Sequence, residues 1–452
     1  MGILHEDMVL VKQEKEGDPT VITVNCPDKT GLGCDLCRIV LIFGLSICRA
    51  DFSTDGKWCY MVFWVVEKPN TNWNLLKNRF LEVCPSYFST SEMDYYRPQN
   101  QQPSPPDVFL LKFWCTYDRE GLLHDVTEVL CELELTIKRV KVSTAPNGKV
   151  MDLFFVTDTR ELLHTKNRKD ETVHHLKAAL GDALISCEID VAGPELTACS
   201  QGSPNLPSEI SEEMFSLELP GKNFYGCPAS NSISVTMDNK FSPSHTLVQI
   251  LCQDHKGLIY DMMRTLKDYN IQISYSRFFA NPKGNCEMDL FIMQADGKKI
   301  VDPTKQDSLR SRLKMELLRP LRVAVVSRGP DTELVVANPV ELSGRGRPLV
   351  FHDITLAFKL LNMRIFSVIF QTNDYFFCFS LIIITLYSSH LYFSLAFNFL
   401  CYSQVEIARH MIRGREWEVY RILLDEGSGL SLPRNKIEAN VRNILMGWDN
   451  RR

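Results

Sequence analysis

The hydrophobic and polar positions follow the same order in three stretches of the chain. Each stretch opens with a short run of β-favouring residues, at 21–25, 108–114 and 247–252. An amphipathic helix is predicted directly after each run, because apolar residues recur there at helical spacings. In the second stretch these apolar residues are Leu122, Leu123, Val126, Val129, Leu130 and Leu133. The pattern therefore predicts a unit that begins with a strand and a helix and occurs three times.

A hairpin and a second helix are predicted to complete each unit. The hairpin turns carry Asn, Asp and Gly, which are typical of tight turns between antiparallel strands. They are Asp55-Gly56, Asn147-Gly148 and 281–284. The second helices are expected at about 73–83, 171–180 and 308–318, and the last strand of the third unit at 321–327. This order of elements is that of the α+β, ferredoxin-like βαββαβ domain, whose sheet is antiparallel.

A short motif joins the first strand of each unit to its helix. It reads Asp-x-x-Gly-Leu-x-x-Asp and occurs at 28–35, 118–125 and 254–261. One copy of so short a motif would carry little weight. Three copies in the same context indicate a repeated domain.

A fourth unit is expected after 330, although its loop lacks the motif. A predicted strand at 332–338 is followed by the loop sequence PVELSGRGRP and by an amphipathic helix at 349–362. In that helix His352-Asp353 corresponds to His124-Asp125 of the second unit. The expected organisation is an N-terminal segment at 1–20, domains at 21–95, 108–190, 246–328 and 331–452, and linkers at 96–107 and 191–245.

The fourth unit contains an uncharged apolar run at 375–405. A run of this length is also the signature of a transmembrane helix. The repeat argues for an insertion instead, because 68 positions separate Leu349 from Trp417, whereas the corresponding spacings in the second and third units are 29 and 30. Removing the 37 residues at 368–404 restores a spacing of 31. We therefore interpret 368–404 as an insertion, and membrane association is not expected.

The ends of the insertion suggest a genetic origin. Every Val codon begins with GT and one Gln codon ends with AG, so an unspliced intron could begin at Val368 and end at Gln404. The stretch FSLAFNFLCYS is what a pyrimidine-rich tract before a splice acceptor would encode. Our hypothesis is a retained intron or an error in the gene model, with a genuine membrane segment as the alternative.

The composition is that of ordinary soluble domains. With a formal net charge of −5, the chain has no global basic field that would attract nucleic acid. The 15 cysteines are scattered inside apolar segments, which favours reduced thiols in the cytoplasm or nucleus over a disulfide scaffold. The N-terminal residues do not have the pattern of a signal peptide, so secretion is not expected.

Over nearly its whole length the chain resembles the plant ACR family, whose members consist of consecutive ACT domains. The Asp-x-x-Gly-Leu loops and the βαββαβ units carry this resemblance. It implies domains that pair side by side and bind free amino acids at their interface, with sensing rather than catalysis as the function. ACT domains also serve as regulatory tails on enzymes, including the glutamine-sensing bacterial uridylyltransferase, so glutamine or another small amino acid is a candidate ligand. A second copy of the chain or another ACT-bearing protein is a candidate partner.

The three Gly-Leu loops are the candidate ligand sites. A loop that enters a helix presents free backbone N–H groups to a carboxylate, and glycine lets a ligand approach the backbone closely. The aspartates could meet an α-ammonium group, and the leucines could close over the ligand's carbon chain. The candidate residues are Asp28, Gly31, Leu32, Asp118, Gly121, Leu122, Asp254, Gly257 and Leu258. The alternative is that glycine serves only turn geometry and that aspartate bonds only the loop backbone.

The common motifs for catalysis and cofactor binding are absent from the sequence. It contains no P-loop, no His-Glu-x-x-His and no Gly-x-Ser-x-Gly. Cys34 and Cys37 lack a second Cys-x-x-Cys and are predicted to pack in the first helix, whereas His174-His175 is predicted to lie on the surface. The sequence therefore predicts an amino-acid-binding regulatory protein without enzymatic activity, cofactor or metal. The alternative is a protein-interaction scaffold that pairs through its ACT domains.

Overall fold

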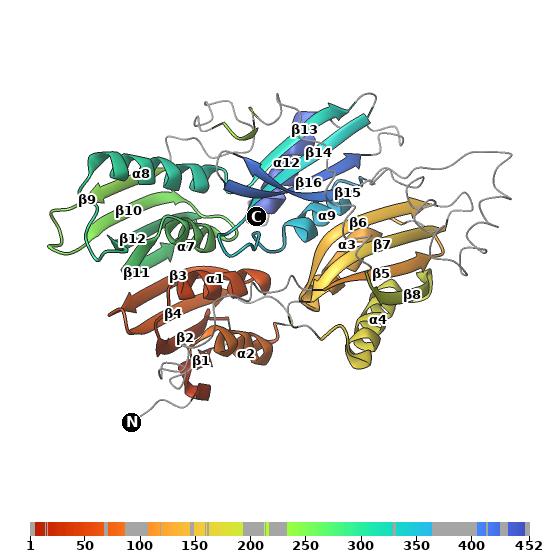
Figure 1. The fold of residues 1–452 in the computed structure, drawn as a ribbon, viewed down its shortest axis with the longest axis horizontal. Helices are drawn as coiled ribbons and strands as arrows, with labels where there is room; N and C mark the ends of the chain where they lie inside the picture. The colour runs from red at the N-terminus through yellow and green to blue at the C-terminus, as the bar shows by residue number, and fades with distance from the viewer. Residues whose placement is uncertain are drawn as a thin grey trace, which may run out of the picture.

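A computed structural model describes most of the chain (Figure 1). The described residues are 5–13, 15, 17–66, 71–85, 107–117, 119–144, 149–158, 160, 162–192, 212, 214–216, 233–328, 331–363, 405–412, 415–424 and 433–447. The interpreted insertion at 368–404 lies outside them. Within these ranges, no helix has both the length and the apolar character needed to cross a membrane.

The chain forms four units, each with a four-stranded sheet and two principal helices. The first unit contains η1 His5–Met8, β1 Val9–Lys12, β2 Thr20–Pro27, α1 Leu32–Ile42, β3 Ser46–Thr54, β4 Trp58–Val66 and α2 Trp73–Val83. The second contains β5 Val108–Cys115, α3 Leu122–Glu132, β6 Leu135–Thr144, β7 Val150–Asp158, α4 Lys166–Leu180, η4 Gly181–Ala183 and β8 Leu184–Val191. The third contains β9 Ser234–Asp238, β10 Thr246–Gln253, α7 Leu258–Asp268, β11 Ile271–Ala280, β12 Asn285–Gln294 and α8 Pro303–Leu318. The fourth contains β13 Arg322–Arg328, β14 Asp331–Pro339, α9 Val350–Leu360, β15 Val405–Ile412, β16 Arg415–Leu424 and α12 Arg434–Met446.

The four units combine into two eight-stranded antiparallel sheets. The first sheet joins the first and third units in the order β1-β2-β4-β3-β11-β12-β10-β9. The second sheet joins the fourth and second units in the order β13-β14-β16-β15-β6-β7-β5-β8. Figure 1 shows the red first unit beside the green third unit, and the blue fourth unit beside the yellow second unit. Units that are neighbours in the sequence therefore do not share a sheet.

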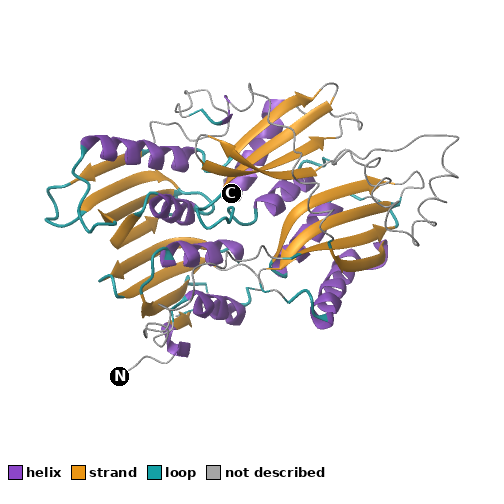
Figure 2. Cartoon of the chain, viewed as in Figure 1, coloured by secondary structure: helices purple, strands orange, loops and turns teal. Residues whose placement is uncertain are grey.

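Helices pack against both sheets and give each a continuous core (Figure 2). Residues of β5 alternate between buried and partly exposed along the whole strand, as expected for a strand with one covered face. The first helices of paired units pack against each other, α1 on α7 and α3 on α9. As a result, one hydrophobic core extends through the first and third units and another through the second and fourth.

The outer strand of the sheet does not occupy the same position in the sequence of every unit. In the second unit it is β8, which follows α4 and pairs with β5, as in the predicted βαββαβ order. In the other three units the outer strand precedes the first central strand. The prediction that 321–327 ends the third unit was wrong, because β13 pairs with β14 of the fourth unit. The third unit takes β9 instead, from the segment expected to be a linker, and β1 comes from the expected N-terminal segment at 1–20.

The physical reason is that sheet position does not depend on chain order. An outer strand needs only an antiparallel partner, and either end of the unit can supply one. Two residues separate β13 from β14, so this pair closes as a short local hairpin at little cost in loop entropy.

The first helices of the four units begin with the same backbone geometry. α1, α3 and α7 follow Gly31, Gly121 and Gly257, which have φ values of +83°, +79° and +77°. In the fourth unit Leu349 takes this position with φ +64°. A left-handed conformation costs a residue other than glycine about 1 to 2 kcal/mol, so the fourth loop keeps the motif's geometry at a penalty. Accordingly α9 begins at Val350, one residue later than predicted.

The spacing in the fourth unit places the excess residues between α9 and β16. In the third unit 15 positions separate Asn270, which follows α7 with a positive φ, from the start of β12 at Asn285. In the fourth unit 53 positions separate the equivalent Asn362 from the start of β16 at Arg415. The difference of 38 is within one residue of the 37 residues interpreted as an insertion.

Candidate functional site

The glycines of the three motif loops face the paired unit. A Cβ atom added to Gly31 would lie 2.7 Å from Lys267 Cε of α7, and one added to Gly121 would lie 2.9 Å from Lys359 Cδ of α9. Both glycines have left-handed backbones that other residues adopt rarely. Glycine at these positions is therefore favoured by the turn geometry, and it leaves room for the lysine side chain of the paired unit.

Gly257 lies against residues of two other units. Its added Cβ would meet Arg347 Nη2 at 2.8 Å and Leu41 Cδ2 at 3.0 Å. Leu41 belongs to α1 of the paired first unit, whereas Arg347 comes from the loop of the fourth unit. This boundary therefore brings three units together.

The predicted leucines and aspartates lie in different surroundings. Leu32, Leu122 and Leu258 are each at most 3% exposed and belong to the two hydrophobic cores, beneath the loops. Asp28 is partly buried, and its Oδ2 accepts a hydrogen bond of 2.6 Å from the Thr54 hydroxyl of β3. This contact is with a side chain of β3 and not with the loop backbone, so it differs from the alternative role stated for the aspartates.

The two other aspartates predicted for the ligand sites are Asp254 and Asp118. Asp254 is partly buried, and its backbone N–H donates to the Gly284 carbonyl at 2.7 Å. Asp118 lies outside the described residues.

The second aspartate of the motif forms ion pairs across the unit boundaries. Lys359 Nζ lies 2.9 Å from Asp125 Oδ1, and Lys267 Nζ lies 3.9 Å from Asp35 Oδ1. Burial would raise the pKa of Asp125, but hydrogen bonds from Lys359 and Arg119 outweigh it and hold that pKa below its usual value. Each pair joins the start of one helix to the end of its partner, where the helix dipoles favour these charges.

The loop of the fourth unit, 340–349, reaches the boundary between the first and third units. Arg38 of α1 donates to the Gly346 carbonyl at 2.6 Å and to Glu341 Oε1 at 3.1 Å. The Tyr260 hydroxyl of α7 donates to the same Glu341 oxygen at 2.6 Å. Although burial acts to raise the pKa of Glu341, Tyr260 and Arg38 hold it below its usual value. The carboxylate therefore stays ionised inside this contact.

Two arginines of the same loop extend the contact. Arg345 Nη2 lies 2.6 Å from Asp35 Oδ1, and Arg347 Nη1 lies 3.7 Å from Asp261 Oδ2. Burial raises the pKa of Asp261 to about 6, although Arg347 and Arg264 act in the opposite direction. From its sequence this loop was distinguished only by lacking the motif. Its two arginines and one glutamate were the available signal of an ionic contact.

A small apolar cavity lies between the first and third units. Its lining includes Cys37, Phe52, Met263 and Phe278. About 20 Å³ of it is open to the centre of a water-sized sphere, which is space for about one water molecule. A free amino acid does not fit in this cavity.

A polar cluster occupies the contact between α3 and α9. His124 Nδ1 lies 3.3 Å from Thr355 Oγ1, and the Thr127 and Thr355 hydroxyl oxygens are 2.8 Å apart. Burial lowers the pKa of His124, and His352 and Lys359 act in the same direction. The sequence indicated only that His352-Asp353 matches His124-Asp125. It did not indicate that the two histidines meet.

The predictions for the other candidate groups are confirmed. Cys34 and Cys37 are buried in the core of the first and third units, and burial raises the pKa of Cys34 to about 12. The pair is therefore packed rather than reactive. His174 and His175 are exposed on α4.

Three family models match parts of the first, third and fourth units. "ACT domain-containing protein ACR10, N-terminal" matches 10–85, and "ACR9-like, ACT-like domain" matches 234–331. "ACT domain-containing protein ACR9, C-terminal" matches 332–373 and 393–447. The last match passes over 374–392, which lie within the interpreted insertion.

Curated relatives cover the whole chain. ACT domain-containing protein ACR10 of Arabidopsis thaliana is 52% identical over 453 residues, which cover 99% of this chain and 100% of the relative. ACT domain-containing protein ACR9 of the same plant is 48% identical over 456 residues, with the same coverage. Among solved structures, the regulatory subunit of aspartate kinase from Thermus thermophilus matches 47% of this chain and 94% of its own at 10% identity, with a TM-score of 0.15 that carries no argument. The two full-length relatives show that the chain belongs to the plant ACR family of ACT domain repeat proteins.

Proposed function

We propose that the chain is a non-catalytic regulatory protein that binds a free amino acid between paired units, and that the Gly121 loop is its principal ligand site. The observation that carries this proposal is the position of Gly121, left-handed at the start of α3 and directly against Lys359 of the paired unit. The start of a helix suits a carboxylate, and a bare backbone lets it approach.

The charges at this loop match an amino acid zwitterion. Lys359 Nζ can pair with the ligand's carboxylate, and the Asp125 carboxylate with its α-ammonium group. The two side chains now pair with each other at 2.9 Å. A zwitterion can exchange this one ion pair for two, which supplies the favourable energy of binding.

The Gly121 loop is more accessible than the other two. The Lys359 side chain is 41% exposed, whereas Lys267 beside Gly31 is 21% exposed. The fourth-unit loop also contacts the boundary at Gly31 and Gly257 through Arg345 and Arg347. A ligand at Gly121 therefore displaces one exposed lysine and no buried loop.

Binding at this place would couple to the pairing of the second and fourth units. A ligand held by both units favours the paired state in proportion to its difference in affinity for the two states. A partner protein, such as another ACT-bearing chain, would then read the pairing.

The test is calorimetric titration of the full chain, and of a chain without 368–404, with the twenty amino acids. We expect one or a few to bind, glutamine among the first to be tried. Lys359→Met should weaken binding about tenfold or more, because a charged hydrogen bond is lost. Gly121→Leu should abolish it, because a side chain there meets Lys359 and strains the backbone.

The matched control is Gly297→Leu. Gly297 has a similar φ of +76°, and an added Cβ there meets nothing within 4 Å. This variant should bind as the unmodified chain does. If none of the twenty amino acids binds either chain, the proposal is wrong and a scaffold that pairs without a small ligand is favoured.

A further inference from the structure

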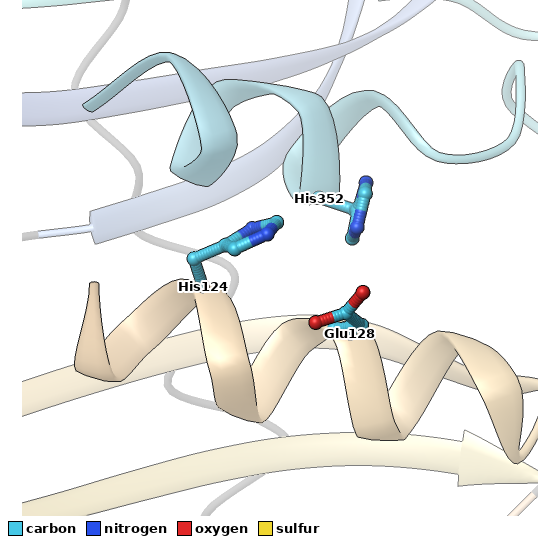
Figure 3. A group of neighbouring side chains, drawn as sticks. All are labelled: His124, Glu128 and His352. Carbon is cyan, nitrogen blue, oxygen red and sulfur yellow. The ribbon is translucent and has the colours of Figure 1, made fainter. Parts of the chain in front are cut away.

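The contact between α3 and α9 brings two histidines and a carboxylate to one point. Figure 3 shows His124 and Glu128 on α3 and His352 on α9 turned toward one another. One ligand atom from each of the three residues can be chosen so that all lie within 4.8 Å of one another. Glu128 follows His124 by four positions, so both project from the same face of the helix. We propose that these three residues bind a divalent transition-metal ion, Zn²⁺ in the first instance.

The hydrogen bonds around the histidines leave one ring nitrogen of each available to bind a metal. Nδ1 of His124 contacts Thr355 Oγ1 at 3.3 Å, and Nδ1 of His352 contacts Asp353 Oδ1 at 3.2 Å. An acceptor at Nδ1 places the proton there and leaves the lone pair of Nε2 for a metal. A carboxylate behind a histidine is the usual outer partner of a zinc ligand.

The outer contacts also hold the ligands in place. Asp353 accepts two hydrogen bonds of 2.7 Å from Lys256 of the third unit, which fixes the carboxylate behind His352. The Thr355 hydroxyl donates to the His352 carbonyl at 2.7 Å, which leaves its oxygen free to accept from His124.

The donor set and its exposure are those of an open zinc site. Two imidazoles and one carboxylate are ligands that Zn²⁺ takes in sites with three protein ligands and a fourth position for water or another molecule. His124 is 5% exposed and Glu128 is exposed. The site therefore opens to solvent on the Glu128 side, where rotation of that side chain can shorten the distances to those of coordination.

The other pair of units lacks this set at the same positions. Counted from the start of each helix, Cys34 of α1 and Tyr260 of α7 correspond to His124 and His352. Arg38 corresponds to Glu128, and its guanidinium pairs with Glu341. A cation there excludes a metal ion, so the donor set distinguishes the pairing of the second and fourth units from that of the first and third.

The metal would join the second and fourth units through their helices. It would link α3 of the second unit to α9 of the fourth, whereas the described residues of β6 and β15 share one register pair, Val140↔Val405. Because the ion binds only when both helices are in place, it stabilises this pairing by a free energy that grows with the logarithm of its concentration over its dissociation constant.

The test uses the full chain, reduced and stripped with a chelator, and Zn²⁺ titrated against a chromophoric competitor. We expect one Zn²⁺ per chain and a higher melting temperature on binding. Glu128→Gln, at an exposed position, should weaken affinity at least tenfold and abolish the melting shift, and His352→Gln should do the same. His174→Gln with His175→Gln is the matched control for adventitious histidine binding and should leave affinity unchanged.

Cobalt distinguishes this site from the cysteines. Co²⁺ at two imidazoles and a carboxylate gives visible bands without the strong near-ultraviolet absorption of thiolate-to-cobalt charge transfer. That absorption would place the ion at cysteine and overturn the proposal. So would the absence of stoichiometric Zn²⁺ uptake, or Glu128→Gln and His352→Gln variants that both bind as tightly as the unmodified chain.

Discussion

The two pairs of units are built on the same plan but are held together differently. β3 and β11 of the first and third units share five register pairs, and the fourth-unit loop adds the buried contact among Arg38, Tyr260 and Glu341. In the part of the chain that the structure describes, β6 and β15 of the second and fourth units share one register pair, and the Lys359–Asp125 ion pair at this boundary is 41% and 17% exposed. Among the described residues, the first boundary is therefore the more buried of the two and the second is the more accessible.

This difference indicates at which boundary a ligand could change the pairing of the units. A small molecule can shift an equilibrium only when the competing states lie close in free energy. The boundary between the first and third units, with its buried charges and five register pairs, is not expected to have competing states close in free energy. The boundary between the second and fourth units, with its helix contacts and partly exposed lysine, is expected to have them. Both the proposed amino acid site and the proposed metal site lie at the second boundary.

The sharpest test compares one carboxylate from each boundary. Glu341→Gln should destabilise the chain by about 3 to 5 kcal/mol, because Arg38 and Lys267 lose a fully buried partner. Asp125→Asn should cost about 1 kcal/mol or less, because its lysine remains in contact with water. Urea denaturation followed by circular dichroism measures both. Equal losses in the two variants would mean that the boundaries do not differ as described.

The second test removes the interpreted insertion. Without 368–404 the residues 364–367 directly precede Val405, so the strand can extend along β6 as β11 extends along β3. About four additional backbone hydrogen bonds should then stabilise the chain by about 3 to 4 kcal/mol. Thermal denaturation and amide exchange along 141–144, the part of β6 that the added residues would face, measure the gain. A shortened chain that melts at the same or a lower temperature would contradict the insertion hypothesis, and a transcript that always encodes 368–404 would contradict its genetic form.

The third test uses pH at the first boundary. The pKa of Asp261 is raised to about 6 from an ordinary value of 3.8, so the folded chain binds more protons than the unfolded chain between about pH 4 and 6. Stability contributed by this group is therefore present below about pH 4 and is lost as the pH rises to about 6 and beyond. The loss amounts to about 2 to 3 kcal/mol.

Asp261→Asn should remove this part of the pH dependence, because the amide carries no titrating proton. Urea midpoints at intervals from pH 4 to 7 compare the variant with the unmodified chain. Parallel curves for the two proteins would show that Asp261 does not titrate in this range.

The sequence alone determined the units and their loops. Strand alternation, helical spacing and the repeated motif correctly predicted tandem ferredoxin-like domains, with glycine at the starts of α1, α3 and α7, and the resemblance to the ACR family identified them as ACT domains. These features were predictable because they depend on residues only a few positions apart. The buried state of Cys34 and Cys37 followed from the same local periodicity.

Only the tertiary structure decided how the units combine. The pairing of the first unit with the third, the origin of the outer strands, the reach of the 340–349 loop and the meeting of His124 with His352 join residues that lie far apart in sequence. Many pairings satisfy the same hydrophobic pattern, because every unit offers a similar sheet edge and a similar helix face. The choice among them depends on long-range packing and on a few charged contacts such as Arg38 with Glu341, which no local pattern encodes.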